Sequence, residues 1–483
     1  MADERSPRAQ RFERRMTDAE ALMWNVEKDP WLNPNGGVIV VCDGVIDAVD
    51  FERRIAFAVS EVPRLRERVV STFGRLSPPV WRVDPEFDLA YHVRRIGLVA
   101  PGTLRELLDL VTRLYQDPFD RLRPLWNFFV VDGLEGGRSA LFWKIHHAIT
   151  DGIGMGYLAE YHLQRTLGTE APPEVDLAEI IAAAVEADRT ANERPSMMSA
   201  MAQTAAHAMR RQAGINRRLM GEMAMWGADP QRAVDVVSNV ATTVRRTRGQ
   251  LITGGGGESS GSPLWRRRSR HRHLEVFEIP LEAASSAAKA LGGSINDLFV
   301  AGAVDGVAAY HEAAGTPIET VNLSFVVSTR TDKAIGGNSF APTRLQVSGG
   351  PMSPQERFAE TRDKMAAKRA EVTGAGLMSN LAGVANLLPT SLVTSAARSQ
   401  ARRQDFATSN VRGSRAERYV SGALVSSQYA FGPVAGTAFN LTTVSYNGKL
   451  ECGLFVDPVA VERPADLRQA MVDAYARLLD TPG

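Results

Sequence analysis

One heptapeptide places two histidines, an aspartate and a glycine where a predicted strand passes into a predicted helix: His146-His147-Ala148-Ile149-Thr150-Asp151-Gly152. The strand is predicted from the alternating residues of the run 139–147. Because side chains alternate between the two faces of a strand, His147 shares the apolar face with Leu141 and Trp143, and His146 lies on the other face. The apolar face should belong to the interior, so we expect His147 to point into the protein.

The heptapeptide predicts a general base. An imidazole with a pKa near neutrality can accept a proton from an alcohol, a thiol or an amine, and His147 is the candidate. His146, on the opposite face, is expected to order the loop. Asp151 and Gly152 should open the next helix, where free backbone N–H groups favour a carboxylate. A lone histidine is more often a core residue, and Asp151 a simple helix cap, but the complete pattern favours a catalytic site.

Composition excludes several classes of protein. The chain has 483 residues, of which 44% are hydrophobic, enough for two or three domains with buried cores. Lysine and arginine number 56 against 55 aspartate and glutamate, and a net charge of +1 is too small for a protein whose main partner is nucleic acid. Cys42 and Cys452 have no metal-ligand or redox spacing, so we expect buried thiols, a reducing compartment and no metal site.

No segment predicts export or a membrane span. The N-terminus is charged throughout, and the apolar runs are far shorter than the roughly 18 residues needed to cross a bilayer. We therefore expect a cytoplasmic protein. Two segments leave open a peripheral contact with the inner face of the membrane or with a lipid droplet: the methionine- and arginine-rich stretch 197–226 and the arginine run 266–273. An interdomain helix is the plainer interpretation of the first segment. The arginine run could attract the phosphate groups of a ligand as well as a lipid surface, and a solvated linker end is an equally open interpretation.

The order of the predicted elements indicates an α+β fold, because strands and helices alternate without a regular βαβ repeat. The expected strands are 37–42, 80–83, 91–98, 126–131, 139–147, 274–279, 320–327, 423–428, 438–446 and 450–456. The expected helices are one opened by a capping box at Thr17, 103–115, much of 176–248, one ended by Gly292 and Gly293, one capped by Ser294, and 464–480. The glycine-rich turn 132–137 should make its two flanking strands an antiparallel hairpin.

A glycine-rich segment, 249–262, divides the chain. We predict an N-terminal domain at 1–200, a helical crossover and linker at 201–262, and a C-terminal domain at 263–483. The linker also matches G-x-S-x-G at 257–261. A nucleophile elbow needs a strand before it and a helix after it, so we discount this match.

Five further motifs accompany the heptapeptide in a defined order: Met16-Thr17-Asp18-Ala19, Phe87-Asp88-Leu89-Ala90-Tyr91-His92-Val93, Pro124-Leu125-Trp126, Ile295-Asn296-Asp297 and Val444-Ser445-Tyr446-Asn447-Gly448. With them the sequence resembles, over nearly its whole length, the wax ester synthase/diacylglycerol acyltransferase family of bacterial O-acyltransferases. That family shares the HHxxxDG motif and its fold with chloramphenicol acetyltransferase and with the condensation domains of peptide synthetases.

One element departs from the family pattern. The family's Asn-Val-Pro-Gly-Pro is replaced by Ser409-Asn410-Val411-Arg412-Gly413-Ser414. The replacement loses both prolines and adds a positive charge. We expect it to loosen the turn and to alter substrate preference.

The resemblance implies two chloramphenicol acetyltransferase-like sandwich domains with a channel between them. Acyl-CoA, as a co-substrate, would enter from one side, and a lipophilic alcohol, either diacylglycerol or a fatty alcohol, from the other. His147 would take the proton of the acceptor hydroxyl, whose oxygen attacks the thioester carbonyl and releases CoA. The resemblance implies no metal, no bound cofactor and no covalent acyl-enzyme.

The resemblance also implies roles for supporting residues. Asp151 is structural in related folds and pairs with an arginine, for which Arg66 is the candidate by position, with Arg64 and Arg68 beside it. Trp126 is expected in the channel wall, where its ring offers apolar area and one N–H donor.

Four polar residues are the remaining candidates for substrate contact: Asn296, Asp297, Asn410 and Ser445. Asn296 would bond the substrate or brace the channel, and Ser445 would help to hold the oxyanion or the acceptor. Asp297 occupies the third position of the helix that Ser294 caps, where a carboxylate stabilises the first turn by about 0.3–1 kcal/mol. A structural and a functional role are therefore equally open for Asp297.

Two other functions remain open. A condensation-type transferase would take its acyl group from a carrier protein instead of from CoA. A non-catalytic lipid-binding protein of the same fold would bind without turnover. The intact HHxxxDG pattern argues against the second, while Arg412 in place of a proline leaves it open.

Overall fold

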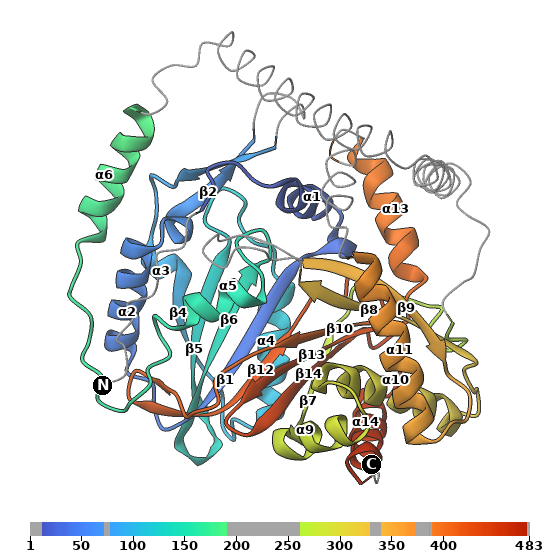
Figure 1. Cartoon of the computed structure of the whole chain (residues 1–483). Coiled ribbons are helices and arrows are strands. Elements are labelled where there is room, and N and C mark those ends of the chain that lie inside the picture. The colour runs from blue at the N-terminus through green and yellow to red at the C-terminus, as the bar shows by residue number, and fades with distance from the viewer. Residues whose placement is uncertain are drawn as a thin grey trace, which may run out of the picture.

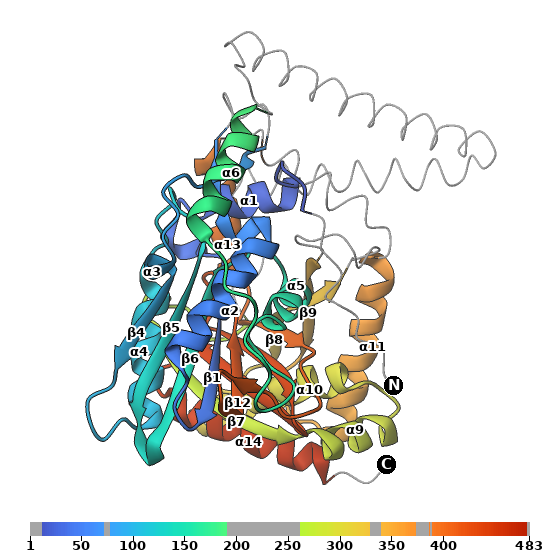
Figure 2. The same ribbon diagram turned by 90° about the vertical axis from the view of Figure 1, so that its left-hand side faces the viewer.

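The structure is a computed structural model that describes residues 12–71, 78–190, 261–328, 340–372, 386 and 389–480. Two six-stranded β-sheets form its framework, and helices pack against them (Figures 1 and 2). A small third sheet pairs β2 (Glu67–Val70) with β3 (Val80–Val83).

The first sheet has the strand order β11-β12-β1-β6-β5-β4. Its strands are β1 (Asn35–Asp43), β4 (Val93–Gly97), β5 (Trp126–Leu134), β6 (Arg138–His146), β11 (Tyr419–Val420) and β12 (Ala423–Phe431). The second sheet has the order β7-β14-β13-β10-β8-β9. Its strands are β7 (His273–Pro280), β8 (Thr320–Ser328), β9 (Phe340–Ser348), β10 (Phe406–Val411), β13 (Phe439–Tyr446) and β14 (Lys449–Val456).

The helices fall into two groups, one in each half of the chain. The first half contains α1 (Asp18–Val26), α2 (Ala48–Glu61), α3 (Leu89–His92), α4 (Leu104–Gln116), α5 (Gly152–Ala159) and α6 (Leu177–Thr190), together with the 3₁₀ turns η1 (Pro30–Leu32), η2 (Pro63–Arg66) and η3 (Glu135–Gly137). The second half contains α9 (Leu281–Ala290), α10 (Ile295–Ala313), α11 (Pro354–Val372), α13 (Thr390–Arg402) and α14 (Pro464–Leu479). The mixture confirms the predicted α+β class.

Three clusters of buried apolar side chains hold these layers together. One lies between the second sheet and the helices α9, α10 and α14, and includes Phe299 and Tyr475. Another lies on the face of the first sheet that carries Trp143 and Ile145. The third lies on the opposite face, where Phe142 meets residues of α4, β7 and β14. The apolar face of β6 is thus interior, as predicted, and the other face is buried as well, because α4 and the second sheet cover it.

Strand β12 joins the two halves of the protein. It comes from the C-terminal part of the sequence, yet it pairs antiparallel with β1 in the first sheet, with Tyr429 opposite Ile39. It also packs across the second sheet, where the backbone N–H of Gln428 donates to the buried carboxyl group of Glu451. The first sheet is therefore built from both ends of the chain.

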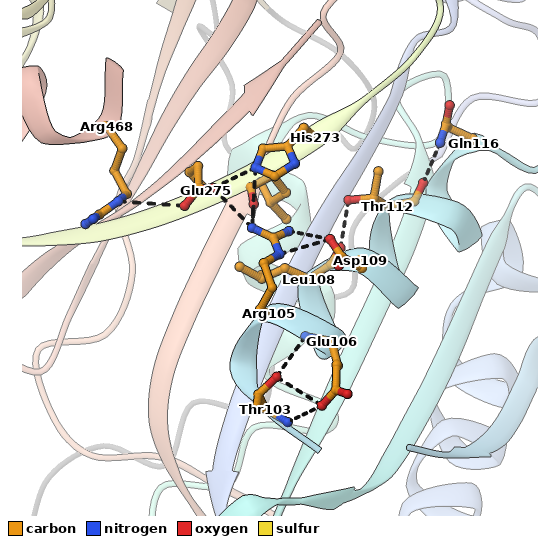
Figure 3. A network of polar contacts seen from close by, with 11 residues as sticks. Thr103, Arg105, Glu106, Leu108, Asp109, Thr112, Gln116, His273, Glu275 and Arg468 are labelled. Atoms are coloured by element: carbon orange, nitrogen blue, oxygen red, sulfur yellow. Dashed lines mark hydrogen bonds and ion pairs between the residues drawn. The ribbon is translucent and has the colours of Figure 1, made fainter. Parts of the chain in front are cut away.

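A polar network makes a second contact between the halves (Figure 3). Arg105 of α4 donates to the Leu274 carbonyl oxygen at 2.8 Å and lies 3.2 Å from Oε1 of Glu275 in β7. It also pairs with Asp109 on its own helix at 2.7 Å, while Arg468 of α14 approaches Glu275 at 3.7 Å. These side chains are partly exposed, and solvent screening limits what each pair adds to stability.

The predicted helix starts and the hairpin are confirmed. Thr17 and Ser294 each form a capping box with the acidic residue three positions later. Strands β5 and β6 form the antiparallel hairpin. The predicted strand 91–98 is wrong at its start, because residues 91 and 92 complete a helical turn that Asp88 caps through the Ala90 N–H.

Parts of the prediction fall on residues that the structure does not describe. The stretch 197–226 and the predicted linker as far as residue 260 lie outside the described residues. Within the described ranges, no helix is long and apolar enough to cross a bilayer. Nor does this part of the chain contain a group of three histidine, cysteine, aspartate or glutamate side chains placed to hold a metal ion. Cys42 and Cys452 are buried free thiols, as predicted, and burial raises the pKa of each to about 12.

Because β12 lies close to β14, a single methyl group added at Gly453 should strongly destabilise the protein. A Cβ atom at Gly453 would lie 2.2 Å from the carbonyl oxygen of Ala430, and a backbone atom cannot move away cheaply. We expect Gly453→Ala to lower the free energy of unfolding by roughly 3 kcal/mol, measured by urea denaturation. Gly97→Ala is the matched control, because a Cβ atom at Gly97 in β4 meets nothing within 4 Å. Equal stability of the two variants would contradict the proposed contact.

Candidate active site

His147 lies immediately beyond β6, against the start of β1. Its backbone N–H donates to the Pro34 carbonyl oxygen at 3.2 Å, which extends the pairing of the two strands by one residue. Its ring lies beside Gly36, where an added Cβ atom would be 3.2 Å from Nε2. The side chain of His147 is partly exposed, whereas His146 is completely buried. Of the two histidines, His147 is therefore the one that a substrate can reach.

His146 fixes the loop that follows the strand. Its Nδ1 accepts a hydrogen bond from the Ala148 backbone N–H at 2.9 Å, and its carbonyl oxygen accepts one from Ile149 at 3.0 Å. Because Nδ1 is an acceptor, a ring proton is assigned to Nε2, which lies 3.5 Å from Oε2 of Glu27. The ring also meets Trp24 edge to face, with centroids 6.3 Å apart.

Glu27 anchors this arrangement from the end of α1. Its carboxylate pairs with Arg121 at 2.6 Å, and the Arg121 guanidinium carbon lies 3.4 Å from the centroid of the Trp24 ring. Burial acts to raise the pKa of Glu27, but its hydrogen bond to His146 and the charges of Arg121 and Lys144 outweigh burial, so the pKa is below its usual value. Glu27 is therefore a carboxylate at neutral pH.

His147 is a neutral imidazole at physiological pH. Burial lowers its pKa to about 4. A hydrogen bond with the Thr150 backbone and the charge of Asp151 oppose this shift without cancelling it. The ring therefore keeps an unprotonated nitrogen, as a general base requires.

Asp151 and Gly152 start α5 at this site. Asp151 is buried, and its Oδ1 accepts a hydrogen bond from the Gly154 N–H at 3.0 Å, the geometry of a helix cap. A Cβ atom at Gly152 would lie 3.3 Å from Cγ2 of Val411, the last residue of β10. The helix after the histidines therefore abuts a strand of the second sheet.

Arg66 does not pair with Asp151, which corrects the predicted partnership. Arg66 ends η2, and its guanidinium turns back to donate to the carbonyl oxygens of Val59 and Ser60, the latter at 2.8 Å. These oxygens lie in the last turn of α2, where carbonyl groups lack partners within the helix. A cation is favoured at that end of a helix, and this local attraction decides the side chain's direction.

The ends of two inner strands of the second sheet, β10 and β13, carry Asn410 and Ser445, and Asn296 of α10 contacts the first of these. Asn410, near the end of β10, donates to Oδ1 of Asn296 at 3.3 Å. Three residues further on, the Gly413 N–H donates to Oγ of Ser445 at 3.1 Å. Through Val411, which follows Asn410, these residues adjoin the start of α5.

Asp297 has structural partners. Its Oδ2 accepts hydrogen bonds from the backbone N–H of Ser294 at 2.9 Å and from the Ser294 hydroxyl at 2.7 Å. Its Oδ1 pairs with Arg369 of α11 at 2.9 Å. Both carboxylate oxygens are thus engaged by the protein, which favours the structural one of the two roles that the sequence leaves open.

Trp126 is a core residue, and its predicted place in a channel wall is not supported. Its side chain is completely buried, and the indole N–H donates to the Leu65 carbonyl oxygen at 2.7 Å. One face of its ring stacks on His92 with centroids 4.4 Å apart. Burial lowers the pKa of His92 to about 4, so this stack is between neutral rings.

Two residues of the site escape a motif-based search. Gly36 provides the room for the His147 ring, and Glu27 holds His146 from a different element. The signal for Gly36 is the pair Gly36-Gly37 at the start of a predicted strand, since glycine inside a strand often marks a close approach. Glu27 has no comparable signal, because nothing in the sequence indicates that the end of α1 meets the end of β6.

Comparison with known proteins gives a consistent result. The family model of the wax ester synthase/diacylglycerol acyltransferase catalytic domain matches residues 16–299, and that of the WS/DGAT C-terminal domain matches residues 336–479. A protein of Mycobacterium tuberculosis strain H37Rv, provisionally named a diacylglycerol O-acyltransferase, is 31% identical over 465 residues, which cover 96% of this chain and 91% of the relative. A second protein of that strain, with the same provisional name, is 29% identical over 86% of each chain.

Two solved structures share the fold. The wax ester synthase/diacylglycerol acyltransferase from Marinobacter aquaeolei VT8 matches with a TM-score of 0.60 at 19% identity, covering 96% of this chain and 98% of the other. The first condensation domain of the calcium-dependent antibiotic synthetase matches with a TM-score of 0.57 at 17% identity, over 97% of each chain. The two-domain, chloramphenicol acetyltransferase-like fold is thereby confirmed.

The buried environment of His147 predicts its titration. With a folded pKa of about 4, the ring should show no titration step between pH 8 and 5.5 in the ¹³C NMR spectrum of histidine-labelled protein. The signal is assigned by its absence from His147→Gln. An unfolded histidine binds its proton near pH 6.5, so the native ring costs stability as the pH falls from about 6.5 toward 4. The native protein should therefore lose more stability than His147→Gln between pH 7 and 5. A titration midpoint near 6.5 for His147 would contradict the buried neutral state.

Proposed function

The chain belongs to the wax ester synthase/diacylglycerol acyltransferase family, and we propose that it transfers the acyl group of an acyl-CoA to the hydroxyl of a lipophilic alcohol, with His147 as the general base. The products would be triacylglycerol from diacylglycerol, wax ester from a fatty alcohol, or both. One observation carries the assignment of the base: of the two histidines of HHxxxDG, His147 is partly exposed, whereas His146 is completely buried with its Nδ1 bonded to the loop.

The proposed step is a direct transfer. The imidazole of His147 takes the proton of the acceptor hydroxyl while the oxygen attacks the thioester carbonyl carbon. A C–O bond forms, the C–S bond breaks, and the imidazolium returns the proton to the departing thiolate. The negative charge of Asp151, which favours the protonated ring, would stabilise the transient imidazolium. A base of this kind is worth about 10² to 10⁴ in rate.

The mechanism needs no group beyond the two substrates. Acyl-CoA is consumed as a co-substrate, and each proton that leaves the acceptor reaches CoA. Positioning of both substrates in a channel between the domains would supply much of the remaining acceleration. We propose that the channel passes His147 between Gly36 on one side and the cluster of Asn296, Asn410 and Ser445 on the other.

The surroundings of His147 suit a lipophilic acceptor. Ile145, on the same face of β6, and the nearby Val444 belong to one apolar cluster, and Val411 packs against it. An alkyl chain would gain roughly 0.8 kcal/mol for each methylene group that it buries in such surroundings. We also propose that the protein works in the cytoplasm and contacts a membrane or a lipid droplet peripherally, since its acceptor is dissolved there.

Replacement of His147 tests the proposed chemistry. Purified protein with palmitoyl-CoA and either dioleoylglycerol or hexadecanol should release free thiol only when an acceptor is present, and should form labelled neutral lipid. His147→Ala should lower kcat by about 10²- to 10⁴-fold while leaving the circular dichroism spectrum unchanged. Unchanged turnover in this variant would exclude His147 as the base. Turnover with a carrier-protein thioester but not with CoA would instead support the condensation-type alternative.

The contact between Gly36 and His147 gives a second test. An alanine at position 36 would place its Cβ atom 3.2 Å from Nε2, and the ring would have to move by a few tenths of an ångström. We expect Gly36→Ala to lower kcat by at least tenfold, because small displacements of a catalytic group are costly. Gly156→Ala is the matched control: it lies in α5, and an added Cβ atom there meets nothing within 4 Å. Equal activity of both variants would show that the position of the ring does not limit the reaction.

A further inference from the structure

Six arginines gather where the end of α13 meets the segment that leads into β7. We call them the arginine face: Arg266, Arg267, Arg268, Arg270, Arg402 and Arg403. The two segments are in direct contact, because the Arg268 guanidinium donates to the carbonyl oxygens of Gln404 at 3.4 Å and of Gly436 at 3.3 Å. The face therefore combines residues that are more than 130 positions apart in the sequence.

Most of this positive charge is exposed and unbalanced. Arg266, Arg267, Arg270 and Arg402 are exposed, and none of them makes an ion pair with another residue in the described ranges. Burial lowers the pKa of Arg268 to about 10, and the charge of Arg402 adds to that shift, while the charges of Asp405 and Asp457 oppose it. Like charges this close are relieved by an anionic partner.

The neighbouring carboxylates are turned inward. Asp405 is completely buried and accepts hydrogen bonds from the backbone N–H groups of Ser262 at 3.0 Å and Asn322 at 2.8 Å. Asp457 is also buried and holds Ser269 and the Val459 N–H. Both acidic groups thus order the backbone beneath the arginine face, and its outer surface presents cations.

The arginine face adjoins the segment that leads to His147. The Arg402 guanidinium carbon lies 6.0 Å from the centroid of the Trp31 ring, and Arg398 on the previous turn lies 5.2 Å from it. Trp31 belongs to η1, and Gly36, which contacts the His147 ring, follows five residues later. Five residues span at most about 18 Å, so Trp31, against which Arg402 lies, is within that distance of Gly36.

We propose that the arginine face binds the phosphate groups of the acyl-CoA donor. CoA carries its pyrophosphate and its 3′-phosphate at the end of an extended pantetheine arm remote from the thioester. The arm would run past Trp31 toward Gly36, which places the thioester at His147 and the phosphates at the arginines. Arginine suits this task because its planar guanidinium bonds phosphate oxygens in pairs. The inference rests on the proposed function.

Kinetics with truncated donors test the assignment. In the double variant Arg267→Gln/Arg402→Gln, KM for palmitoyl-CoA should rise roughly tenfold with little change in kcat, as expected for lost charge-assisted bonds. KM for palmitoyl-pantetheine, which has no phosphate, should be the same in variant and native protein. Palmitoyl-dephospho-CoA, which lacks only the 3′-phosphate, shows which phosphate the face holds. Arg53→Gln is the matched control, an exposed arginine of α2 outside the site. An unchanged KM for palmitoyl-CoA, or an equal rise for palmitoyl-pantetheine, would overturn the proposal.

Equilibrium binding separates this inference from the proposed function. Calorimetric titration with CoA itself should give roughly tenfold weaker binding to the double variant than to the native protein and the Arg53→Gln control. That result would support the face as a CoA site even if the protein transferred no acyl group. Absence of CoA binding to the native protein would overturn the inference. So would a variant that loses sedimentation with phosphatidylglycerol vesicles, relative to phosphatidylcholine vesicles, while keeping its affinity for CoA.

Discussion

The pairing of β12 with β1 is the constraint on which the rest of the structure depends. β12 is a strand of the C-terminal half that completes the first sheet, and its other side packs across β13 and β14. β1 in turn carries Gly36 against the His147 ring, while the second sheet carries Val411 against the start of α5. β12 therefore connects the two sides of the site directly. A change in the register of β12 would move the Gly36 side relative to the Val411 side.

The two histidines owe their different roles to the elements that surround them. His146 has its Nδ1 bonded to the loop and its Nε2 facing Glu27, and that carboxylate is held in place by Arg121. Both ring nitrogens of His146 are therefore engaged in holding the loop and the end of α1 in place. His147 has a buried ring environment that keeps it neutral, with a pKa of about 4. Such a ring is a weak base in isolation, so the proposed transfer at neutral pH would depend on the stabilisation of the imidazolium by Asp151 and on close positioning of the acceptor.

Sequence reasoning was most successful where a signal is local. The capping boxes at Thr17 and Ser294 and the hairpin at residues 132–137 are set by residues a few positions apart, and the structure contains all of them. It failed where the partner is distant in sequence. The strands β9 and β10 and the helices α2, α11 and α13 have no counterpart among the predicted elements. Position in the sequence indicates Arg66 as the partner of Asp151, but its guanidinium binds carbonyl oxygens in the last turn of α2.

The residues around His147 can likewise be predicted only where they are close to it in the sequence. The HHxxxDG motif identifies His147, His146 and Asp151, because all three residues lie within one heptapeptide. Trp126 lies in the core because its indole N–H meets the Leu65 carbonyl oxygen, a contact that no spacing indicates. Glu27 and Gly36 enter the site through the packing of α1 and β1 around the end of β6. Which side chains surround a catalytic residue depends on tertiary contacts, and a motif records only those that adjoin it in sequence.

The turn at Asn410 to Ser414 shows how one sequence departure is accommodated. Without the prolines of the family pattern, the sequence suggests a looser turn. In the structure β10 runs parallel to β13, with Val411 beside Val444. The Gly413 N–H then donates to Ser445 at 3.1 Å, and the Ser414 carbonyl oxygen accepts from Asn447 at 3.1 Å. Hydrogen bonds to the next strand thus supply the restriction that proline rings would otherwise impose. The exposed Arg412 side chain is left as the chemical difference at this turn, and its effect on substrate preference stays a prediction.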